Sequence, residues 1–339
     1  MNDMSAKILV IGPSWVGDMV MAQSLFRLLK QANEEVRIDV VAPAWSEPLI
    51  ARMPEVRRSI EMPLGHGKFK PLERLRLGRQ LASEKYAQAI VLPYTWKSAL
   101  LPYGAKIAKR TGFKGEARWG LLNDIRLLDK KKLPMMVERY VSLGFKKNAF
   151  NHQDFPKPKL VTSEKLQQAV LSKLDLQESA KDVVAFCPGA EYGPAKQWPT
   201  THYAKLAIKL IESGKTIWLL GSAKDSTIAQ EINRLTSHKC NDLTGRTSLE
   251  DVIDLLALVS LVVCNDSGLM HIAAAVDTPV VALYGSSDPG YTPPLSDKTK
   301  IVSLELECSP CFKKECPLGH YDCLQGLSVE QVWKDINLS

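Results

Sequence analysis

The stretch Leu261–Ala275, LVVCNDSGLMHIAAA, places a short apolar run directly before an apolar helical pattern. The run Leu261–Cys264 has the length and composition of a buried parallel strand, and the helical pattern restarts at Leu269 after a polar turn. A strand that passes straight into a helix is the repeating unit of a parallel α/β sheet. This stretch therefore constrains the fold more than any other.

The same alternation recurs along both halves of the chain. We expect strands near residues 8–11, 36–41, 89–92, 183–186, 216–220, 261–264 and 280–284, and helices over 19–31, 72–83, 99–109, 135–147, 203–211, 228–235, 249–259, 270–275 and 329–336. The region 148–162, with two prolines and little periodicity, is the expected linker. The sequence thus predicts an α/β protein of two doubly wound parallel-sheet domains, 1–155 and 163–339, that face a cleft. For the last helix, over 329–336, two placements are open: on the second domain, or back on the first domain.

Composition limits the classes of function. The 339 residues, 45% of them apolar, suffice for two cores, and the longest apolar run, Leu255–Cys264, is too short for a membrane span. The N-terminus enters a strand at Lys7 without a basic and apolar leader, so we expect no signal peptide and a cytoplasmic chain with reduced cysteines. Residues 1–155 hold 26 Lys and Arg against 15 Asp and Glu, whereas residues 156–339 hold 18 against 22. The first half is expected to meet an anionic partner, with a merely solvated basic surface as the alternative.

The segment GPSWVGDM, which begins at Gly12, follows the first strand and opens the first helix. It matches the first six positions of a phosphate-binding P-loop, but Asp18 and Met19 stand where Lys and Ser or Thr would hold phosphate and magnesium. Because a carboxylate repels phosphate, a nucleoside triphosphatase is disfavoured, and the lack of G-x-G-x-x-G disfavours a dinucleotide site. Asp18, beside Gly17, is instead a candidate general base for a hydroxyl nucleophile, with a plain helix-terminal charge as the alternative.

Two segments of the second half suit a phosphate group. Asp266, Ser267 and Gly268 lie at a strand end and a helix start, where unpaired N–H groups attract anions, and His271 follows on the first turn. An ordinary capped helix is the alternative. The loop CPGAEYGPAKQWP brings Lys196 to another strand end, which suits a phosphate leaving group. An exposed loop lysine is the alternative there.

Three segments together resemble the ADP-heptose:lipopolysaccharide heptosyltransferases of glycosyltransferase family 9: IGPSWVGD (11–18), PGAEYGPAKQWP (188–199) and NDSGLMH (265–271). Supporting segments lie at 42–45, 52–56, 62–67, 118–124 and 221–225, and the resemblance extends from Ile8 to about Pro294. It implies a GT-B fold of two Rossmann-like domains, with the acceptor in the first and the nucleotide-sugar in the second. It also implies inverting transfer of L-glycero-D-manno-heptose from ADP-heptose onto the first heptose of the Kdo-lipid A inner core. Transfer onto Kdo itself is the alternative.

The resemblance implies roles for individual residues. The general base falls on Asp18 and the diphosphate-binding lysine on Lys196; the other expected donor ligands are Gly189, Ala190, Glu191, Tyr192, Ser222, Asp225, Arg246, Thr247, Asp266, Ser267, Gly268 and His271. On the acceptor side we expect Gly17 and, from the basic first half, Arg57, Arg58 and Arg118. No two aspartates lie two residues apart, so we expect leaving-group stabilisation without a required metal or other cofactor.

Four of the seven cysteines, Cys308, Cys311, Cys316 and Cys323, lie within 16 residues, with His320 among them. Four thiols at this density can bind a structural Zn²⁺, although only the first spacing, C-x2-C, is typical of a zinc half-site. Reduced or partly oxidised thiols are the alternative. The segment lies beyond the donor motifs, and we expect a structural role for it.

Two other function classes compete with the transferase. A nucleotide-sugar epimerase or dehydrogenase is disfavoured by the missing dinucleotide fingerprint. A non-catalytic module that binds lipopolysaccharide or nucleic acid would have no need of Asp18 and Lys196. The basic half also lacks a stripe of interleaved aromatic residues, so we expect no nucleic-acid partner. The expected partners are ADP-heptose and a heptosyl-Kdo-lipid A acceptor, reached by peripheral contact with the inner face of the inner membrane.

Overall fold

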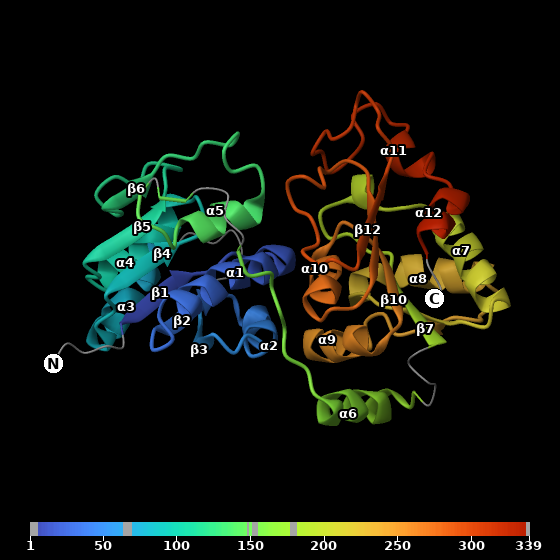
Figure 1. Cartoon of the computed structure of the whole chain (residues 1–339), viewed down its shortest axis with the longest axis horizontal. Helices are drawn as coiled ribbons and strands as arrows, with labels where there is room; N and C mark the ends of the chain where they lie inside the picture. The colour runs from blue at the N-terminus through green and yellow to red at the C-terminus, as the bar shows by residue number, and fades with distance from the viewer. Residues whose placement is uncertain (1–5, 64–69, 148, 151–154, 177–181, 337–339) are drawn as a thin grey trace. The chain divides into compact units, whose positions relative to one another are not determined.

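The computed structural model describes residues 6–63, 70–147, 149–150, 155–176 and 182–336. Part of the expected linker and most of the segment 62–67 therefore lie outside the described residues. The chain forms two compact units, Met1–Pro158 and Lys159–Ser339, and the division falls inside the stretch 148–162. Each unit is described by itself below (Figure 1).

The first unit holds a parallel six-stranded sheet in the order β3-β2-β1-β4-β5-β6. Its strands are β1 (Lys7–Ile11), β2 (Arg37–Ala42), β3 (Val56–Glu61), β4 (Gln88–Val91), β5 (Lys109–Phe113) and β6 (Asp124–Arg126). Its helices are α1 (Val16–Ala32), α2 (Glu47–Ile50), α3 (Pro71–Leu81), α4 (Leu100–Gly104) and α5 (Met136–Ser142). Helix α1 packs with α5, and α3 packs with α4. Met19 and Phe26 of α1 are fully buried, as the apolar pattern of this helix requires. Leu9 of β1 is also fully buried, in a core cluster that includes Leu81 of α3 and Leu101 of α4.

The second unit holds another parallel sheet, in the order β12-β11-β10-β7-β8-β9. Its strands are β7 (Val183–Cys187), β8 (Thr216–Leu219), β9 (Asn241–Asp242), β10 (Leu261–Asn265), β11 (Val280–Tyr284) and β12 (Thr299–Ser303). Its helices are α6 (Glu164–Leu174), α7 (Thr200–Glu212), α8 (Ser226–Leu235), α9 (Leu249–Leu258), α10 (Gly268–Ala275), α11 (Asp322–Gln325) and α12 (Val329–Asp335). Helix α7 packs with α8 and α12, and α9 packs with α6 and α10. The last helix thus packs on its own unit, against α7 and β12.

Both sheets have the same strand order. Counted within each unit, the order is 3-2-1-4-5-6, and it reverses direction between β1 and β4 in the first unit and between β7 and β10 in the second. This is the doubly wound architecture that the sequence predicts. Open sheets of this type bind ligands outside the carboxyl ends of the strands at the point of reversal. The loops that follow β1, β4, β7 and β10 are therefore the places where the fold itself favours a site.

The structure departs from the sequence prediction mainly at the sheet edges. The helix expected over residues 99–109 ends at Gly104, and Lys109 already begins β5. Strand β3, VRRSIE, carries charge along most of its length, and strand β12, TKIVS, has one buried residue. Edge strands tolerate such polar sequences because one side of the strand faces no partner. Neither strand has the apolar run by which the central strands are recognised.

Candidate donor and catalytic site

Asn265, the last residue of β10, holds the loop between β7 and α7 in place through hydrogen bonds. The Asn265 side chain is fully buried; its Oδ1 accepts from the Trp198 backbone N–H and the Tyr203 hydroxyl, each at 3.1 Å, and its Nδ2 donates to the Pro188 carbonyl at 2.6 Å. Trp198, 1% exposed, donates its indole N–H to the Leu327 carbonyl at 2.8 Å. Asn265 thus ties the two expected donor motifs together. This role was not predicted from the sequence, although an Asn at the end of an apolar strand is a signal for it.

Lys196 lies at the end of the short 3₁₀ helix Pro194–Lys196 in this loop. Its Nζ donates to Asp266 Oδ2 at 2.5 Å and lies 5.0 Å from the centroid of the Tyr192 ring. The side chains of Lys196 and Asp266 are 17% and 5% exposed, so the pair is largely screened from water. The structure therefore brings together two of the residues predicted to bind the donor, across the point where the strand order reverses.

Helix α10 begins directly after this ion pair. Ser267 occupies the N-cap position with an extended backbone but makes no side-chain cap, and its hydroxyl is buried without a hydrogen-bond partner. An ordinary capped helix, the alternative considered for this motif, would have that hydroxyl bonded to the first turn. The first-turn N–H groups of α10 thus lack a side-chain acceptor from Ser267, and such groups attract anions.

His271, on the first turn of α10, is 5% exposed. Burial lowers its pKa to about 4; the Asp266 charge opposes this shift and the Lys196 charge adds to it. The imidazole is therefore neutral near pH 7. It offers a hydrogen-bond donor and an acceptor beside the Lys196–Asp266 pair, rather than a second cation.

The remaining expected donor ligands lie on neighbouring loops of the second unit. Asp225 accepts from the backbone N–H and the hydroxyl of Ser222, both at 2.8 Å, and its carboxylate lies against Gly189, where any Cβ would collide with it. Arg246 and Thr247 bond backbone carbonyls of their own loop. Glu191, which pairs with Lys224 at 2.5 Å, is exposed, whereas Ala190 is buried. Gly189 must be glycine for the loop and Asp225 to approach each other.

Asp18 lies on the first turn of α1, directly after the loop that follows β1. Gly12 permits this turn, because a Cβ there would lie 2.7 Å from the Met19 side chain and 3.3 Å from the Val41 carbonyl oxygen. Gly17 and Asp18 are both half-buried. Asp18 therefore lies at the ligand-binding edge of the first sheet, and this position suits both a general base and a charge that favours the helix N-terminus.

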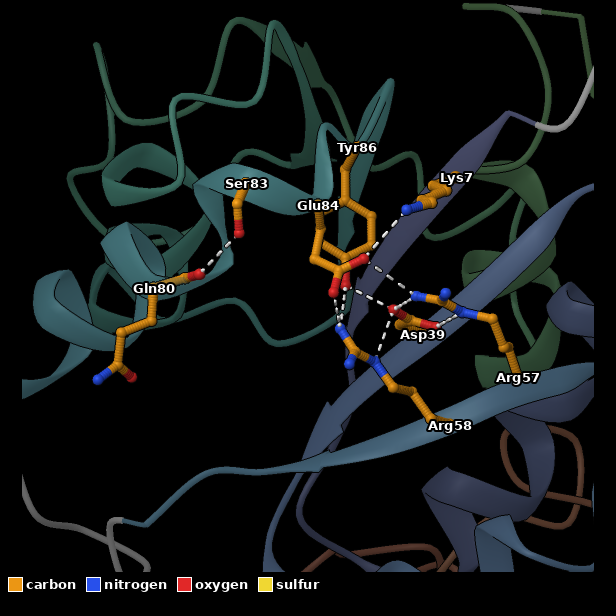
Figure 2. A network of polar contacts seen from close by, with 8 residues as sticks. All are labelled: Lys7, Asp39, Arg57, Arg58, Gln80, Ser83, Glu84 and Tyr86. Atoms are coloured by element: carbon orange, nitrogen blue, oxygen red, sulfur yellow. Dashed lines mark hydrogen bonds and ion pairs between the residues drawn. The ribbon is translucent and has the colours of Figure 1, made fainter. Parts of the chain in front are cut away.

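Arg57 and Arg58, which were predicted to contact the acceptor, take part in an ion-pair network within the first unit. Both bind the fully buried Asp39: Arg57 Nε lies 2.8 Å from Oδ1, Arg58 Nε lies 3.1 Å from Oδ2, and the Tyr86 hydroxyl donates to Oδ2 at 2.5 Å (Figure 2). Glu84 forms ion pairs with both arginines. Burial alone would raise the pKa of Asp39, but the hydrogen bonds from Arg57 and Tyr86 and the two arginine charges hold it below its usual value.

The position of this network also argues against the acceptor prediction. Arg57 and Arg58 lie in the first half of β3, whereas Asp18 follows the carboxyl end of β1. They therefore lie toward the amino edge of a parallel sheet, away from the edge that binds ligands. Arg118 is also structural: it is 2% exposed, and its guanidinium donates to the carbonyls of Phe113 and Pro93.

A different basic surface lies at the carboxyl edge of the first sheet. An open depression of about 500 Å³ follows the ends of β4, β5 and β6 and is lined by three cations and three larger apolar or aromatic side chains: Tyr94, Lys114, Leu127, Leu128, Lys130 and Arg139. Arg139 donates to the Leu133 and Pro134 carbonyls, which leaves the two lysines as the more adaptable cations. This surface is not predicted from the sequence because its lining residues come from four separate segments.

The four clustered cysteines are free thiols, as are the three buried ones. In the part of the chain that the structure describes, no three His, Cys, Asp or Glu side chains are already arranged as ligands around one point. Backbone N–H groups, that of Tyr321 foremost, lower the pKa of Cys316.

Among the described residues, no helix is long and apolar enough to cross a membrane.

Comparison with known proteins agrees with this geometry. The family model for glycosyltransferase family 9 (heptosyltransferase) matches residues 74–322. The chain is 47% identical to lipopolysaccharide heptosyltransferase 2 of Salmonella typhimurium, over 98% of this chain and 97% of that protein. It is 48% identical to lipooligosaccharide heptosyltransferase 2 of Haemophilus influenzae, over 97% and 98% of the two chains.

Solved structures lead to the same family. The structure of Escherichia coli ADP-heptose lps heptosyltransferase II superimposes with a TM-score of 0.87 at 43% identity, covering 98% of this chain and 97% of that one. E. coli heptosyltransferase WaaC with ADP, at 22% identity and a TM-score of 0.72, shares the fold over 97% of this chain and 99% of that one. The chain is a glycosyltransferase, and it belongs to glycosyltransferase family 9, the heptosyltransferases.

Proposed function

We propose that the chain transfers L-glycero-D-manno-heptose from ADP-heptose to the first heptose of the Kdo-lipid A inner core of lipopolysaccharide, with inversion at the anomeric carbon. The observation that carries this proposal is the Lys196–Asp266 pair beside the uncapped start of α10. A cation and a helix N-terminus at one strand-order reversal are suited to a diphosphate leaving group. The names of the similar heptosyltransferases 2 support the choice of sugar and acceptor.

The second unit supplies the donor side of the proposed reaction. The diphosphate accepts from the first-turn N–H groups of α10 and from Lys196, and neutral His271 offers a further hydrogen bond. As the bond between the anomeric carbon and the phosphate oxygen breaks, negative charge grows on the departing ADP. Lys196 and the helix N-terminus stabilise that charge in the transition state more than in the ground state, which is the condition for catalysis.

The first unit supplies the general base that activates the nucleophile. The acceptor hydroxyl attacks the anomeric carbon from the face opposite the diphosphate, while the Asp18 carboxylate takes its proton. One bond forms, one breaks, and the configuration inverts in a single displacement. The proposed charge stabilisation uses no metal, and we propose that no further cofactor is required.

We propose the depression at the carboxyl edge of the first sheet as the acceptor site, in preference to the three arginines. Lys114 and Lys130 supply cations for the phosphates and carboxylates of the acceptor, and Leu127, 73% exposed, supplies an apolar contact. Such an acceptor is anchored in a membrane, so we propose that the protein works in the cytoplasm with peripheral contact at the inner face of the inner membrane.

One assay tests the reaction and its acceptor together. ADP release from ADP-heptose is measured with Kdo-lipid A acceptors that bear zero, one or two heptoses. We expect turnover with the acceptor that bears one heptose and little with the other two. Preference for the acceptor without heptose would move the activity to transfer onto Kdo. Binding of the acceptors without ADP release from any of them would leave a lipopolysaccharide-binding module and contradict the proposal.

A further inference from the structure

The cysteine segment 308–323 surrounds a small cavity of about 20 Å³ in the second unit. Cys308, Cys311, Cys316 and Cys323 are all among the residues that line it, together with residues of the loops that follow β7 and β11, among them Ala195 and Ser286. Ser286 is 1% exposed, and its hydroxyl has no hydrogen-bond partner. A cavity of this volume has room for one water-sized occupant. The segment thus brings four cysteine residues to the lining of one cavity that has room for a single ion.

The same segment supports the loop that carries Lys196. The Ala195 backbone N–H donates to the Lys314 carbonyl at 3.0 Å, and the Tyr192 hydroxyl donates to the Phe312 carbonyl at 2.7 Å. Gly193, at a φ of +151°, packs closely on Lys314, because a Cβ there would lie 2.6 Å from the Lys314 carbonyl oxygen. The position of the Lys196 loop therefore depends on the position of the cysteine segment.

The segment also bonds the loop that follows β11. The Phe312 backbone N–H donates to the Ser286 carbonyl at 2.7 Å, and the Ser309 hydroxyl donates to the Gly285 carbonyl. It therefore contacts two loops at the carboxyl edge of the second sheet. Small shifts of the segment are transmitted to both.

Little in the segment's own packing fixes it there. None of residues 303–323 is buried, and the stretch between β12 and α11 contains no helix or strand. A peptide that buries so little apolar surface cannot offset its conformational entropy by packing, and small folds of this kind use disulfides or a metal instead. The cysteines are free thiols, so a disulfide does not fulfil this task in the structure.

We propose that Cys308, Cys311, Cys316 and Cys323 bind one Zn²⁺, and that this ion fixes the segment that supports the Lys196 loop. Four thiolates in a tetrahedron are a preferred ligand set of zinc. Four thiolates complete a tetrahedral ligand set, so His320, whose Nδ1 accepts from the Asp322 backbone N–H at 3.0 Å, is not needed as a ligand. Since no three ligand-type side chains in the described residues yet surround one point, the thiols must turn into the cavity. Binding releases four protons to solvent and forms four sulfur–zinc bonds.

The metal is tested directly on the whole chain. Protein purified under reducing conditions is analysed for zinc, and Co²⁺ is exchanged into it as a spectroscopic probe. We expect one zinc per chain, a sulfur-to-cobalt charge-transfer band and the strong visible bands of tetrahedral cobalt. Cys316→Ser should lose both signals, whereas Cys240→Ser, a buried cysteine bonded to Thr236 outside the segment, should keep them. Protein without zinc, whose four segment thiols react freely or form disulfides, would overturn the site.

The supporting role needs a second measurement, which rests on the proposed function because it uses the donor nucleotide. ADP binding is measured by calorimetry on zinc-loaded and zinc-stripped protein. Loss of about one hydrogen bond from the Lys196 loop predicts binding weaker by about threefold to tenfold. Added Zn²⁺ should restore the affinity of the stripped wild type but not of Cys316→Ser. Equal ADP affinity with and without zinc would refute the coupling. Zinc binding in a protein without heptose transfer would instead refute the proposed function alone.

Discussion

Removal of the Lys196 side chain tests whether the ion pair with Asp266 is a working part of the donor site. In Lys196→Ala the Asp266 carboxylate, 5% exposed, loses the ammonium at 2.5 Å and remains buried and charged. Breaking a buried pair in this way costs about 3–5 kcal/mol. Because the lysine side chain is still 17% exposed, we expect the free energy of unfolding to fall by about 3 kcal/mol, the lower end of that range.

The same substitution affects the donor in two ways. It removes the cation that meets the diphosphate, and it exposes the diphosphate to an uncompensated carboxylate. We expect kcat to fall by about 10²–10³, as is typical when one preorganised group at a developing charge is lost. We also expect weaker ADP-heptose binding, because a like charge then lies next to the phosphates.

The double variant Lys196→Ala/Asp266→Asn separates these effects. It removes the unpaired carboxylate, so stability and donor affinity should return toward wild type, while kcat stays low because the cation is still absent. Urea unfolding of the whole chain, calorimetry with ADP-heptose and ADP-release kinetics measure the three quantities. If the effects of the two substitutions on stability are additive, the pair is not coupled and the reasoning fails. A Lys196→Ala enzyme with normal kcat would show that Lys196 has no part in leaving-group departure.

Four further predictions concern Asp18, the lysines of the acceptor depression, the metal requirement of transfer and His271. Asp18→Asn keeps the shape but not the basicity of the side chain, so kcat should fall by about 10²–10⁴ with ADP-heptose affinity unchanged; activity within a few-fold of wild type would assign the base elsewhere. In the proposed acceptor site, Lys114→Ala and Lys130→Ala should each raise the KM for the acceptor and weaken the salt dependence of that KM. Lys85→Ala, on the exposed turn before β4, is the matched control. Equal effects of all three substitutions would refute the acceptor site. Brief EDTA treatment should leave transfer intact, and loss of activity that Mg²⁺ restores would contradict the metal-independent mechanism. His271 has a pKa of about 4 in the folded protein, against about 6.5 when unfolded, so it is neutral in the folded state near pH 7. Its contribution to the free energy of unfolding is present above pH 6.5 and is lost as the pH falls toward 4, by about 3 kcal/mol. His271→Gln should flatten the pH dependence of the unfolding free energy over that interval, and an unchanged pH profile would place the dependence on another group.

The parts of the fold that the sequence predicts correctly are those whose pattern is local. Three central strands are buried on both faces, so each contains an unbroken apolar run: Val183–Cys187, Leu261–Cys264 and Val280–Tyr284. The donor motifs follow such strands at once, and their place at the sheet edge is set by the parallel topology. The strand-order reversal then brings Lys196 and Asp266 together, although 70 residues separate them.

What the sequence could not predict depends on partners far along the chain. Arg57 and Arg58 look like free cations because Asp39 and Glu84, which bind them, lie 18 or more residues away. Asn265 was a similar case, since its role appears only when the Trp198 loop returns to it. A side chain's availability is a property of the folded neighbourhood, and local pattern carries little information about it.

The surplus of positive charge in the first half illustrates this limit. Part of that charge is used within the unit: Arg126, for example, binds Asp124 at 2.9 Å and the Phe145 carbonyl. Arg118 likewise donates to the backbone carbonyls of Phe113 and Pro93. A guanidinium engaged in this way stabilises the fold and adds little to the recognition of a ligand. The cations that we propose for an anionic acceptor, Lys114 and Lys130, lie at the carboxyl edge of the sheet, where the doubly wound fold presents its loops. Net charge therefore indicates the class of partner, and the sheet topology decides which lysines meet it.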